Sequence, residues 1–526
     1  MTGNTPARSH ARWAPPALLL ILPLLLIGLY TFPRFNGLYG QDPYAYFDYA
    51  VENFLPGFIV SFEPLPSFFW PPGYPILVSI AALLTGPEPL AGQIVSLGMG
   101  LLTPFATALL AYDLWPYRGE RSWLMPLAAG ILVAFTAQLW QSSVVVMADT
   151  TGLASATFGV WGIARYGRQV QAIQASSTDN RTAGGVQPGW LILGSVALAY
   201  AILTRWAYAL VAIPVLLYCL FLVRFRPRRR AVTHLLIAGL AGGLVLSPLV
   251  VPVIETVLGM GSVGAPRFTG NLAVYSWNPV NAFRNTFFTT DGWLRYRLPN
   301  GLYYALIPAH VFYFTPLIAV FLIPGLIAIF RSRKVDQILL LAGWGGVVYL
   351  FHAGAPWQNF RFGLAYLPPA AIIASLGIAE TAIYLRGRYR PFLIGAVVAG
   401  VVWMGIGGWL LTNRFIDRSQ EDLESIPWLA ERLPPDALLM ALGLTQTIGH
   451  NSDIDTREFF NLDPGQIETL LAAGRPVFLF VQPDVIETQW RTLSPGLNFR
   501  WLEENHALEP IDNFRDYTLY EVVPKT

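Results

Sequence analysis

Long apolar segments, separated by short polar or charged stretches, recur along the chain as far as residue 411. A helix needs about 20 apolar residues to cross the roughly 30 Å hydrocarbon core of a bilayer, so each long segment predicts a transmembrane helix. The candidate segments are residues 14–32, 73–85, 91–114, 123–140, 150–164, 190–203, 206–223, 234–258, 306–330, 337–351, 363–385 and 392–411.

Segment 73–85 is too short to cross, because its helix reaches only about 20 Å at 1.5 Å per residue. A full crossing would also place the basic clusters outside, against the preference of Lys and Arg for cytoplasmic loops. These clusters are Arg118 with Arg121 and residues 224–230, 331–334 and 386–390. We therefore predict a half-inserted helix on the outer face at 73–85, and about eleven transmembrane helices.

Eleven crossings assign each loop to one side of the membrane. Arg8, His10 and Arg12 place the N-terminus in the cytoplasm. The basic clusters are then cytoplasmic too, whereas loop 352–361 and the chain after residue 411 face outward. The sequence therefore predicts a multi-pass protein of the cytoplasmic (inner) membrane with an extracytoplasmic C-terminal part.

Residues 412–526 have the composition of a soluble domain. Strand-like runs at 437–442, 477–481 and 517–523 lie between helical patterns at 419–432, 464–473 and 484–492. A segment of about 110 residues is long enough to fold independently. The predicted architecture is an all-α polytopic membrane domain, residues 1–411, followed by a small α/β domain, residues 412–526.

Composition indicates that the bilayer is the main solvent, since 54% of the 526 residues are hydrophobic and 13% are charged. The net charge of +2 gives no indication of nucleic-acid binding, and the single cysteine, Cys219, cannot form an intramolecular disulfide. The sequence has no GxGxxG after a strand, Walker A, HExxH or paired CxxC motif. These features disfavour a nucleotide-driven cytoplasmic enzyme.

The first predicted outer loop carries three carboxylates, Asp42, Asp48 and Glu52, among many aromatic residues. Aspartate followed by proline is typical of a helix start, where the aspartate caps the backbone. A belt at the membrane surface would explain aromatics such as Tyr44 and Tyr46, but not the acids. Because a carboxylate partly buried among rings is a stronger base, Asp42 is also a candidate general base.

Asp149 and Arg205 lie at two other predicted outer turns. Asp149 precedes segment 150–164 and is either an ordinary helix cap or a second acid beside Asp42. Arg205 lies on the side of the membrane where arginine is disfavoured. Its guanidinium would suit a lipid phosphate through paired charge-assisted hydrogen bonds, and the alternative is that it snorkels to water.

A third outer loop carries His352 and Arg361, and Arg361 is again a positive charge on the outer side. A polar turn that anchors a helix end explains this loop as well as a phosphate or sugar contact does. The sequence also leaves open whether a divalent cation bridges Asp42 and Asp149, which carboxylates in a water-filled site would permit. No other cofactor is indicated.

Five features follow one another in order between residues 37 and 369. They are an acid that opens the first outer loop, a short helix with two prolines, an acid before a span, a basic residue between two spans, and an Arg-aromatic pair before a Leu-Pro-Pro span. Their sequences are DPYAYFDYA, WPPGYPILVSIAAL, VVVMADTTGLASATF, LALAYAILTRWAYALVAIP and NFRFGLAYLPP. Together they resemble the GT-C superfamily of membrane glycosyltransferases, in the branch with bacterial protein O-mannosyltransferase-like and aminoarabinose transferase-like enzymes.

The resemblance implies a GT-C core and a sugar donor carried on a polyprenyl phosphate, with membrane lipids around it. Asp42 matches the catalytic acid of the family, Asp149 would support it, and Arg205, Arg361 and His352 would bind the donor phosphate. The residues of the first loop that would contact donor or acceptor are Tyr44, Tyr46, Asp48 and Glu52. The implied activity is inverting transfer of a hexosyl or pentosyl group to a hydroxyl of a lipid, glycan or protein at the outer face.

Two positions depart from the family pattern, and the lysine that some branches carry after the two prolines is absent. Pro43 stands where a second acid often follows the first, and Gln93 replaces an arginine often found early in the next span. The C-terminal domain has no WWDxG motif, which argues against a metal-dependent asparagine transferase. The main alternative function is a transporter or flippase, whose polar residues would lie in mid-span rather than in outer loops.

Overall fold

The computed structural model describes residues 14–61, 68–114, 123–176, 186–224, 228–257, 276–385 and 387–525. Several features behind the topology prediction lie outside these ranges. They are the N-terminal Arg8, His10 and Arg12, the pair Arg118 and Arg121, residues 225–227 of the run 224–230, and residue 386.

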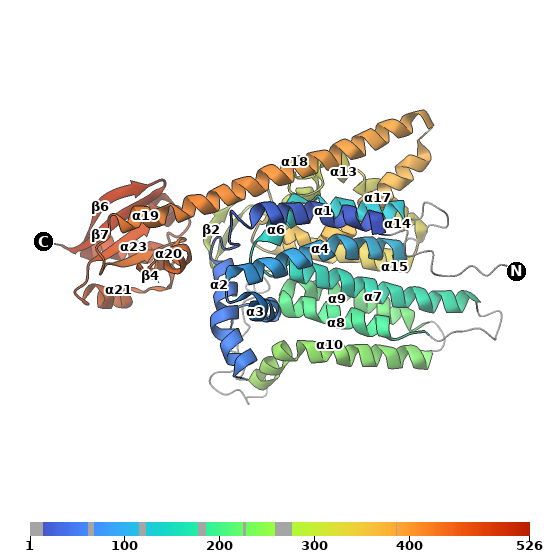
Figure 1. Cartoon of the computed structure of the whole chain (residues 1–526), viewed down its shortest axis with the longest axis horizontal. Helices are drawn as coiled ribbons and strands as arrows, with labels where there is room; N and C mark the ends of the chain where they lie inside the picture. Colours follow the sequence, from blue (N-terminus) through green and yellow to red (C-terminus); the bar gives the residue numbers. More distant parts are fainter. Residues whose placement is uncertain are drawn as a thin grey trace.

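Most of the described chain is helical, and the helices run side by side along the long axis of the molecule (Figure 1). Their bounds are α1 (Ala14–Thr31), α4 (Pro89–Leu114), α5 (Leu124–Ala134), α6 (Ala137–Val144), α7 (Asp149–Ser176), α8 (Gly189–Thr204), α9 (Ala209–Leu222), α10 (Arg228–Val257), α12 (Asn300–Leu306), α13 (Thr315–Ala319), α14 (Leu322–Ser332), α15 (Val335–Gln337), α16 (Trp344–Gly354), α17 (Leu367–Tyr384) and α18 (Arg390–Leu423). Helices form at the predicted apolar segments because a backbone in lipid must satisfy its hydrogen bonds internally.

The described part of the chain has six helical stretches that are long and apolar enough to cross a membrane, or seven if the bent pair α5 and α6 is one span. The six are Pro89–Leu114, Arg229–Val250, Thr315–Ser332, Val335–Gly354, Phe360–Tyr384 and Gly387–Ala430. Shorter apolar helices are Leu18–Thr31, Gly73–Thr85, Gly189–Thr204 and Trp206–Leu222. By length and composition, these helices are those of a multi-pass membrane protein.

Short elements lie across the end of the bundle next to residues 425–524, which we call the domain end (Figure 1). There α2 (Asp42–Asp48) continues into the π-helix η3 (Tyr49–Val60), and α3 (Gly73–Thr85) packs against η3. Ser79 of α3 donates a hydrogen bond to the carbonyl of Ala50 at 2.8 Å. The bounds of α3 are those of the predicted short helix.

Segment 123–140 is broken in the structure, although its apolar pattern predicts one helix. It forms α5 and α6, which meet at a bend of 59°. The backbone of Thr136 is extended there, with ψ 119°, and the N–H of Gln138 donates to the carbonyl of Phe312 at 3.0 Å. A loop distant in the sequence therefore accepts a hydrogen bond from a free N–H at the start of α6. The hydrophobic pattern of residues 123–140 carries no information about this contact.

α18 runs without a break from Arg390 to Leu423 and connects the bundle to the C-terminal domain (Figure 1). Residue 411, where the composition of the sequence changes, therefore lies inside a helix. The division of the chain at that residue stays a prediction about domains.

The C-terminal domain is built on a five-stranded mixed sheet of order β4-β3-β5-β7-β6. β3 pairs in parallel with β4 and β5, and β7 pairs antiparallel with β5 and β6. The elements are α19 (Ser425–Ala430), β3 (Leu438–Ala441), α20 (Thr445–Asn451), β4 (Asp455–Glu458), α21 (Pro464–Leu471), β5 (Val477–Val481), α22 (Pro483–Thr488), α23 (Ser494–Asn505), β6 (His506–Phe514) and β7 (Tyr517–Pro524). Every residue of β3 and β5 is buried because α21 and α23 cover one face of the sheet and α19 and α20 the other. The predicted small α/β fold at this end of the chain is confirmed.

A hairpin of β1 (Thr286–Thr289) and β2 (Gly292–Arg295) lies between the bundle and the C-terminal domain. The N–H of Trp293 donates to the carbonyl of Gln489 at 2.8 Å. Gly292 has φ +85°, and a side chain there would collide with the same carbonyl. The hairpin is therefore docked on the C-terminal domain at a position that requires glycine.

Candidate active site

A cavity of about 720 Å³ lies at the domain end of the bundle, within the roughly 300–1,000 Å³ common for ligand sites. Its lining residues come from the first loop, the starts and ends of several helices, the β1–β2 hairpin and the C-terminal domain. The predicted site residues among them are Asp42, Tyr46, Asp149, Arg205, His352 and Arg361. The fold thus brings six of the nine predicted residues to one cavity.

Helix packing places Asp149 beside Arg205, because α7 begins at Asp149 and α8 ends one residue before Arg205. The two helices approach closely at glycines. A Cβ at Gly159 or Gly194 would lie 2.8 Å from backbone atoms of the facing helix, and one at Gly162 would lie 2.9 Å away. Small residues therefore permit the contact that aligns the acid with the arginine.

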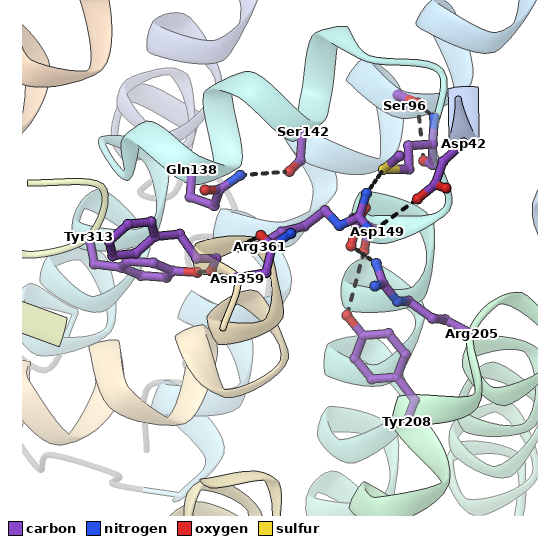
Figure 2. Close-up of polar contacts among 12 residues, drawn as sticks. Asp42, Ser96, Gln138, Ser142, Asp149, Arg205, Tyr208, Tyr313, Asn359 and Arg361 are labelled. Atoms are coloured by element: carbon purple, nitrogen blue, oxygen red, sulfur yellow. Dashed lines mark hydrogen bonds and ion pairs between the residues drawn. The ribbon is translucent and has the colours of Figure 1, made fainter. Parts of the chain in front are cut away.

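Four charged side chains form one ion-pair network, drawn in Figure 2. Asp149 is 2% exposed and pairs with Arg205 and, at 3.7 Å, with Nε of Arg361. Another nitrogen of Arg361 lies 3.2 Å from Oδ2 of Asp42, so this guanidinium bridges the two acids. Two carboxylates and two guanidiniums leave the network neutral, which offsets part of the cost of burying each charge.

Asp42 is the first residue of α2 but does not cap it. The cap position is Gln41, and no side chain makes a capping hydrogen bond there. The carboxylate of Asp42 instead faces Arg361, and its side chain is 38% exposed. The interpretation of Asp42 as a helix cap is therefore wrong, because its oxygens are turned toward the cavity rather than toward the backbone of its own helix.

The two arginines keep positive charge in the cavity. Burial, with a smaller contribution from Arg361, lowers the pKa of Arg205 to about 10, so Arg205 is a cation near pH 7. The guanidiniums of Arg205 and Arg361 lie 5.6 and 5.9 Å from the ring centre of Phe362. Two guanidiniums held this way can bind an anion such as a phosphate.

Tyr46 and His352 line the cavity without joining the network. Tyr46 stacks on Trp70 with ring centres 4.8 Å apart, and burial raises the pKa of its hydroxyl, which therefore stays protonated. His352 is 4% exposed and lies between the rings of Tyr304 and Phe362. Its Nε2 has no hydrogen-bond partner among the described residues, and such an atom beside a cavity is a candidate ligand contact.

Tyr44, Asp48 and Glu52 do not line the cavity. Asn451 of α20 donates to the hydroxyl of Tyr44 at 3.2 Å, and Nδ1 of His450 lies 3.8 Å from Asp48. Residues four apart share a helix face and residues two apart do not. Tyr44 and Asp48 therefore face the C-terminal domain when Asp42 and Tyr46 face the cavity, and Glu52 is exposed on η3.

The described residues contain no group of three or more His, Cys, Asp or Glu side chains arranged to hold a metal ion. Arg361 also lies between the carboxylates of Asp42 and Asp149. A divalent cation that bridged these two acids would have to displace the guanidinium. The arrangement fits an anion between the arginines better than a cation between the acids.

Some lining residues were not predicted from the sequence. Gln489 and Trp490 come from the C-terminal domain, and Trp206 follows Arg205. The Nε1 atom of Trp206 is buried without a hydrogen-bond partner in the described structure. Gln489 and Trp490 carry no local signal, because they reach the cavity only through the docking of the C-terminal domain on the hairpin.

Known proteins resemble this chain in structure rather than in sequence. No protein-family model and no curated protein sequence matches it. ArnT from Cupriavidus metallidurans in the apo state matches with a TM-score of 0.59 and 13% identity, over 97% of this chain and 96% of ArnT. ArnT bound to undecaprenyl phosphate matches with a TM-score of 0.57 and 13% identity, over 98% of both chains.

The archaeal oligosaccharyltransferase AglB from Archaeoglobus fulgidus, in complex with an inhibitory peptide and a dolichol-phosphate, matches with a TM-score of 0.56 and 13% identity. The match covers 91% of this chain and 70% of AglB. At this identity the likeness concerns the fold, and its near-complete coverage includes both the bundle and the C-terminal domain. The chain therefore has the fold of the GT-C glycosyltransferases, as the sequence resemblance predicted.

Proposed function

We propose that this protein is an inverting glycosyltransferase that moves a sugar from a polyprenyl-phosphate donor to an acceptor hydroxyl at the outer face of the cytoplasmic membrane. The observation that carries the proposal is the network of Asp42, Arg361, Asp149 and Arg205. It sets a proton acceptor beside two phosphate-binding cations in one cavity. The fold comparison supports the donor class, because the ArnT and AglB structures contain undecaprenyl phosphate and dolichol-phosphate.

In the proposed reaction the acceptor oxygen attacks the anomeric carbon while its proton passes to Asp42. The bond between the anomeric carbon and the phosphate oxygen breaks, and its electron pair leaves with the polyprenyl phosphate. Attack from the side opposite the leaving group inverts the anomeric configuration. Arg205 and Arg361 stabilise the charge that develops on the phosphate, and Nε2 of His352 offers it a further hydrogen bond.

Asp149 is proposed to be a positioning residue. It is buried and pairs with both arginines, so it holds their guanidiniums beside the cavity. Arg361 is also paired with Asp42. A donor phosphate that enters beside Arg361 competes for the guanidinium, and the carboxylate of Asp42 then becomes free to accept a proton.

The proposed topology has eleven spans, a cytoplasmic N-terminus and an extracytoplasmic C-terminal domain, residues 412–526. α1 begins at the end of the bundle remote from that domain and α18 ends beside it (Figure 1), as an odd number of crossings requires. The end of α14, with Arg331, and the start of α18, with Arg390, lie at the remote end. Their positive charges agree with a cytoplasmic location for that end.

Replacing Asp42 with Asn tests the proposed activity. We expect release of sugar from lipid-linked donors, extracted from cells that lack the protein, to fall about 10²- to 10⁴-fold, the usual effect of losing a general base. Thermal unfolding should change little, because the Asp42 side chain is 38% exposed. The control is Asp484→Asn, an exposed acid of α22.

Sugar transfer by Asp42→Asn at the wild-type rate would exclude Asp42 as the general base. Movement of the intact lipid-linked sugar from one leaflet of a proteoliposome membrane to the other, with no release of the sugar, would instead support a flippase.

A further inference from the structure

Beyond the ion-pair network, the cavity has a second wall made from three separate parts of the chain. The hairpin contributes Asp291 and Tyr296, the segment after α16 contributes Trp357, and the C-terminal domain contributes Gln489 and Trp490. We call these five residues the domain-side wall. None of the chemistry assigned to the network uses them.

Hydrogen bonds hold the domain-side wall together without a ligand. Nε1 of Trp357 donates to Oδ2 of Asp291 at 2.8 Å, and Nε2 of Gln489 donates to the carbonyl of Asp291 at 2.7 Å. The N–H of Trp293 donates to the carbonyl of Gln489 at 2.8 Å. Asp291 therefore connects the bundle, the hairpin and the C-terminal domain, and the wall is organised before any substrate arrives.

The side chains of the wall suit an uncharged, hydroxyl-rich ligand. Its three rings, Tyr296, Trp357 and Trp490, offer flat apolar surface with polar edges. Asp291 and Gln489 offer oxygens that accept hydrogen bonds from hydroxyl groups. A sugar presents the complementary chemistry, because each ring has an apolar C–H face and a rim of hydroxyls.

Charge argues against an acidic ligand at this wall. Among the described residues that line the cavity, the arginines are Arg205 and Arg361, and both belong to the network. The wall itself carries the carboxylate of Asp291, which repels a phosphate or carboxylate.

An extended peptide is also disfavoured. Peptides commonly bind such surfaces by pairing with a free strand edge. On β2, the N–H of Trp293 is already used by Gln489, so this position is not available to a peptide backbone.

We propose that the domain-side wall is the acceptor subsite and that it takes a neutral glycan, whose hydroxyl is presented to Asp42. This inference rests on the proposed function, because the wall and the network line one cavity. It narrows the acceptor from a lipid, glycan or protein to an uncharged saccharide. It also gives the C-terminal domain a direct part in substrate recognition through Gln489 and Trp490.

The test is direct binding, which needs no transfer. The purified full-length protein in detergent is mixed with neutral manno-, galacto- or gluco-hexasaccharides, and binding is measured by ligand-observed NMR titration. We expect at least one hexasaccharide to bind, and Trp490→Ala to weaken its binding about tenfold, or about 1.4 kcal/mol, because the substitution removes one aromatic face of the wall. Trp490→Phe, which keeps a ring, should retain most of the affinity and shows that loss in Trp490→Ala is not misfolding.

The matched control is Trp293→Ala. Trp293 lies on the hairpin that carries Asp291 and is 49% exposed, but it is not among the residues that line the cavity. Binding of the hexasaccharide is measured without a sugar donor, whereas Asp42→Asn is judged by sugar transfer, so failure of the proposed reaction and failure of the proposed subsite are distinguishable.

The proposal is overturned if no neutral hexasaccharide binds, or if Trp293→Ala weakens binding as much as Trp490→Ala. It is equally overturned if an acidic hexasaccharide or a serine-containing peptide binds and competes at the wall while the neutral hexasaccharides do not.

Discussion

Arg361 is the residue on which the geometry of the cavity depends most. Its guanidinium lies 3.2 Å from Asp42 and 3.7 Å from Asp149, and no other described side chain forms an ion pair with both acids. A planar group with several N–H donors can serve two partners at once, whereas an ammonium group acts as a point charge. The proposed chemistry therefore needs arginine here, not positive charge alone.

Arg361→Lys should lower transfer roughly 10- to 100-fold, because one charge-assisted hydrogen bond contributes about 1.5–3 kcal/mol. The loss should appear mainly as weaker use of the lipid-linked donor, measured as transfer against donor concentration. Arg331→Lys is the matched control, since Arg331 bonds to Tyr384 at the remote end of the bundle. Unchanged donor dependence in Arg361→Lys would contradict the role given to Arg361.

We expect the free energy of unfolding to depend on pH because of the Asp48 carboxyl. Burial, with Glu52 as the second cause, raises the pKa of its carboxyl from 3.8 to about 6. Because the folded state binds this proton more tightly than the unfolded state, the stabilisation is complete below about pH 4 and is lost as the pH rises through 6. Nδ1 of His450 lies 3.8 Å away, but burial lowers the pKa of this imidazole, so it is neutral above pH 7 and does not compensate the carboxylate.

Asp48→Asn should therefore unfold at the wild-type temperature near pH 4 and at a higher temperature at pH 7.5. Thermal unfolding of the purified protein at both pH values measures this. Glu468→Gln, an exposed acid of α21, should show the same small difference from wild type at both pH values. If Asp48→Asn unfolded at a lower temperature than the wild type at pH 7.5, the Asp48 carboxylate would instead be stabilised as a paired anion, and the prediction would be wrong.

At the scale of elements, the contact between the hairpin and the C-terminal domain shapes one side of the cavity. Gly292 has φ +85°, and a Cβ there would collide with the carbonyl of Gln489. Gly474 has φ +72°, and a Cβ there would meet nothing within 4 Å. The two glycines separate the effect of backbone strain from the effect of a blocked contact.

Gly292→Ala should lower the unfolding temperature more than Gly474→Ala does. Both variants place alanine at positive φ, at about 1 kcal/mol or more, and only the first pushes the hairpin away from Gln489. Limited proteolysis near the hairpin should also become faster in Gly292→Ala alone. Equal effects of the two substitutions would show that the docking contributes nothing to stability.

Helical periodicity within α2 decides which residues of the first loop can take part in chemistry. Asp42 and Tyr46 are four residues apart and line the cavity, whereas Tyr44 and Asp48 share the other face and contact α20. The sequence contained this information in its spacing. It did not contain the direction of the cavity, so all of these residues were grouped as one predicted site.

At the scale of the whole molecule, the bundle and the C-terminal domain enclose the cavity together. Gln41 donates to Glu458 at 3.2 Å on one side, and Gln489 bonds to Asp291 on the other. The domain is therefore attached at two places beside the cavity. This arrangement requires the cavity and the domain to lie on the same side of the membrane.

Reporter fusions after residues 228 and 452 test that topology. The eleven-span proposal places residue 228 in the cytoplasm and residue 452 outside, so a phosphatase reporter should be active only at 452 and a fluorescent cytoplasmic reporter only at 228. A fusion after residue 524 should match the one at 452. The same result at 228 and 452 would exclude the odd number of crossings that the proposal places between these two residues.

The sequence by itself determined the local elements: apolar runs became helices, segment 73–85 became α3, and segment 477–481 became β5. Such features follow from hydrophobic pattern and backbone hydrogen bonding, which act over a few residues. The tertiary structure alone decided the bend between α5 and α6, the pairing of Asp42 with Arg361 across 319 positions, and the arrival of Gln489 at the cavity. These contacts depend on how helices and domains pack, and the energy of that packing is spread over residues that no local pattern connects.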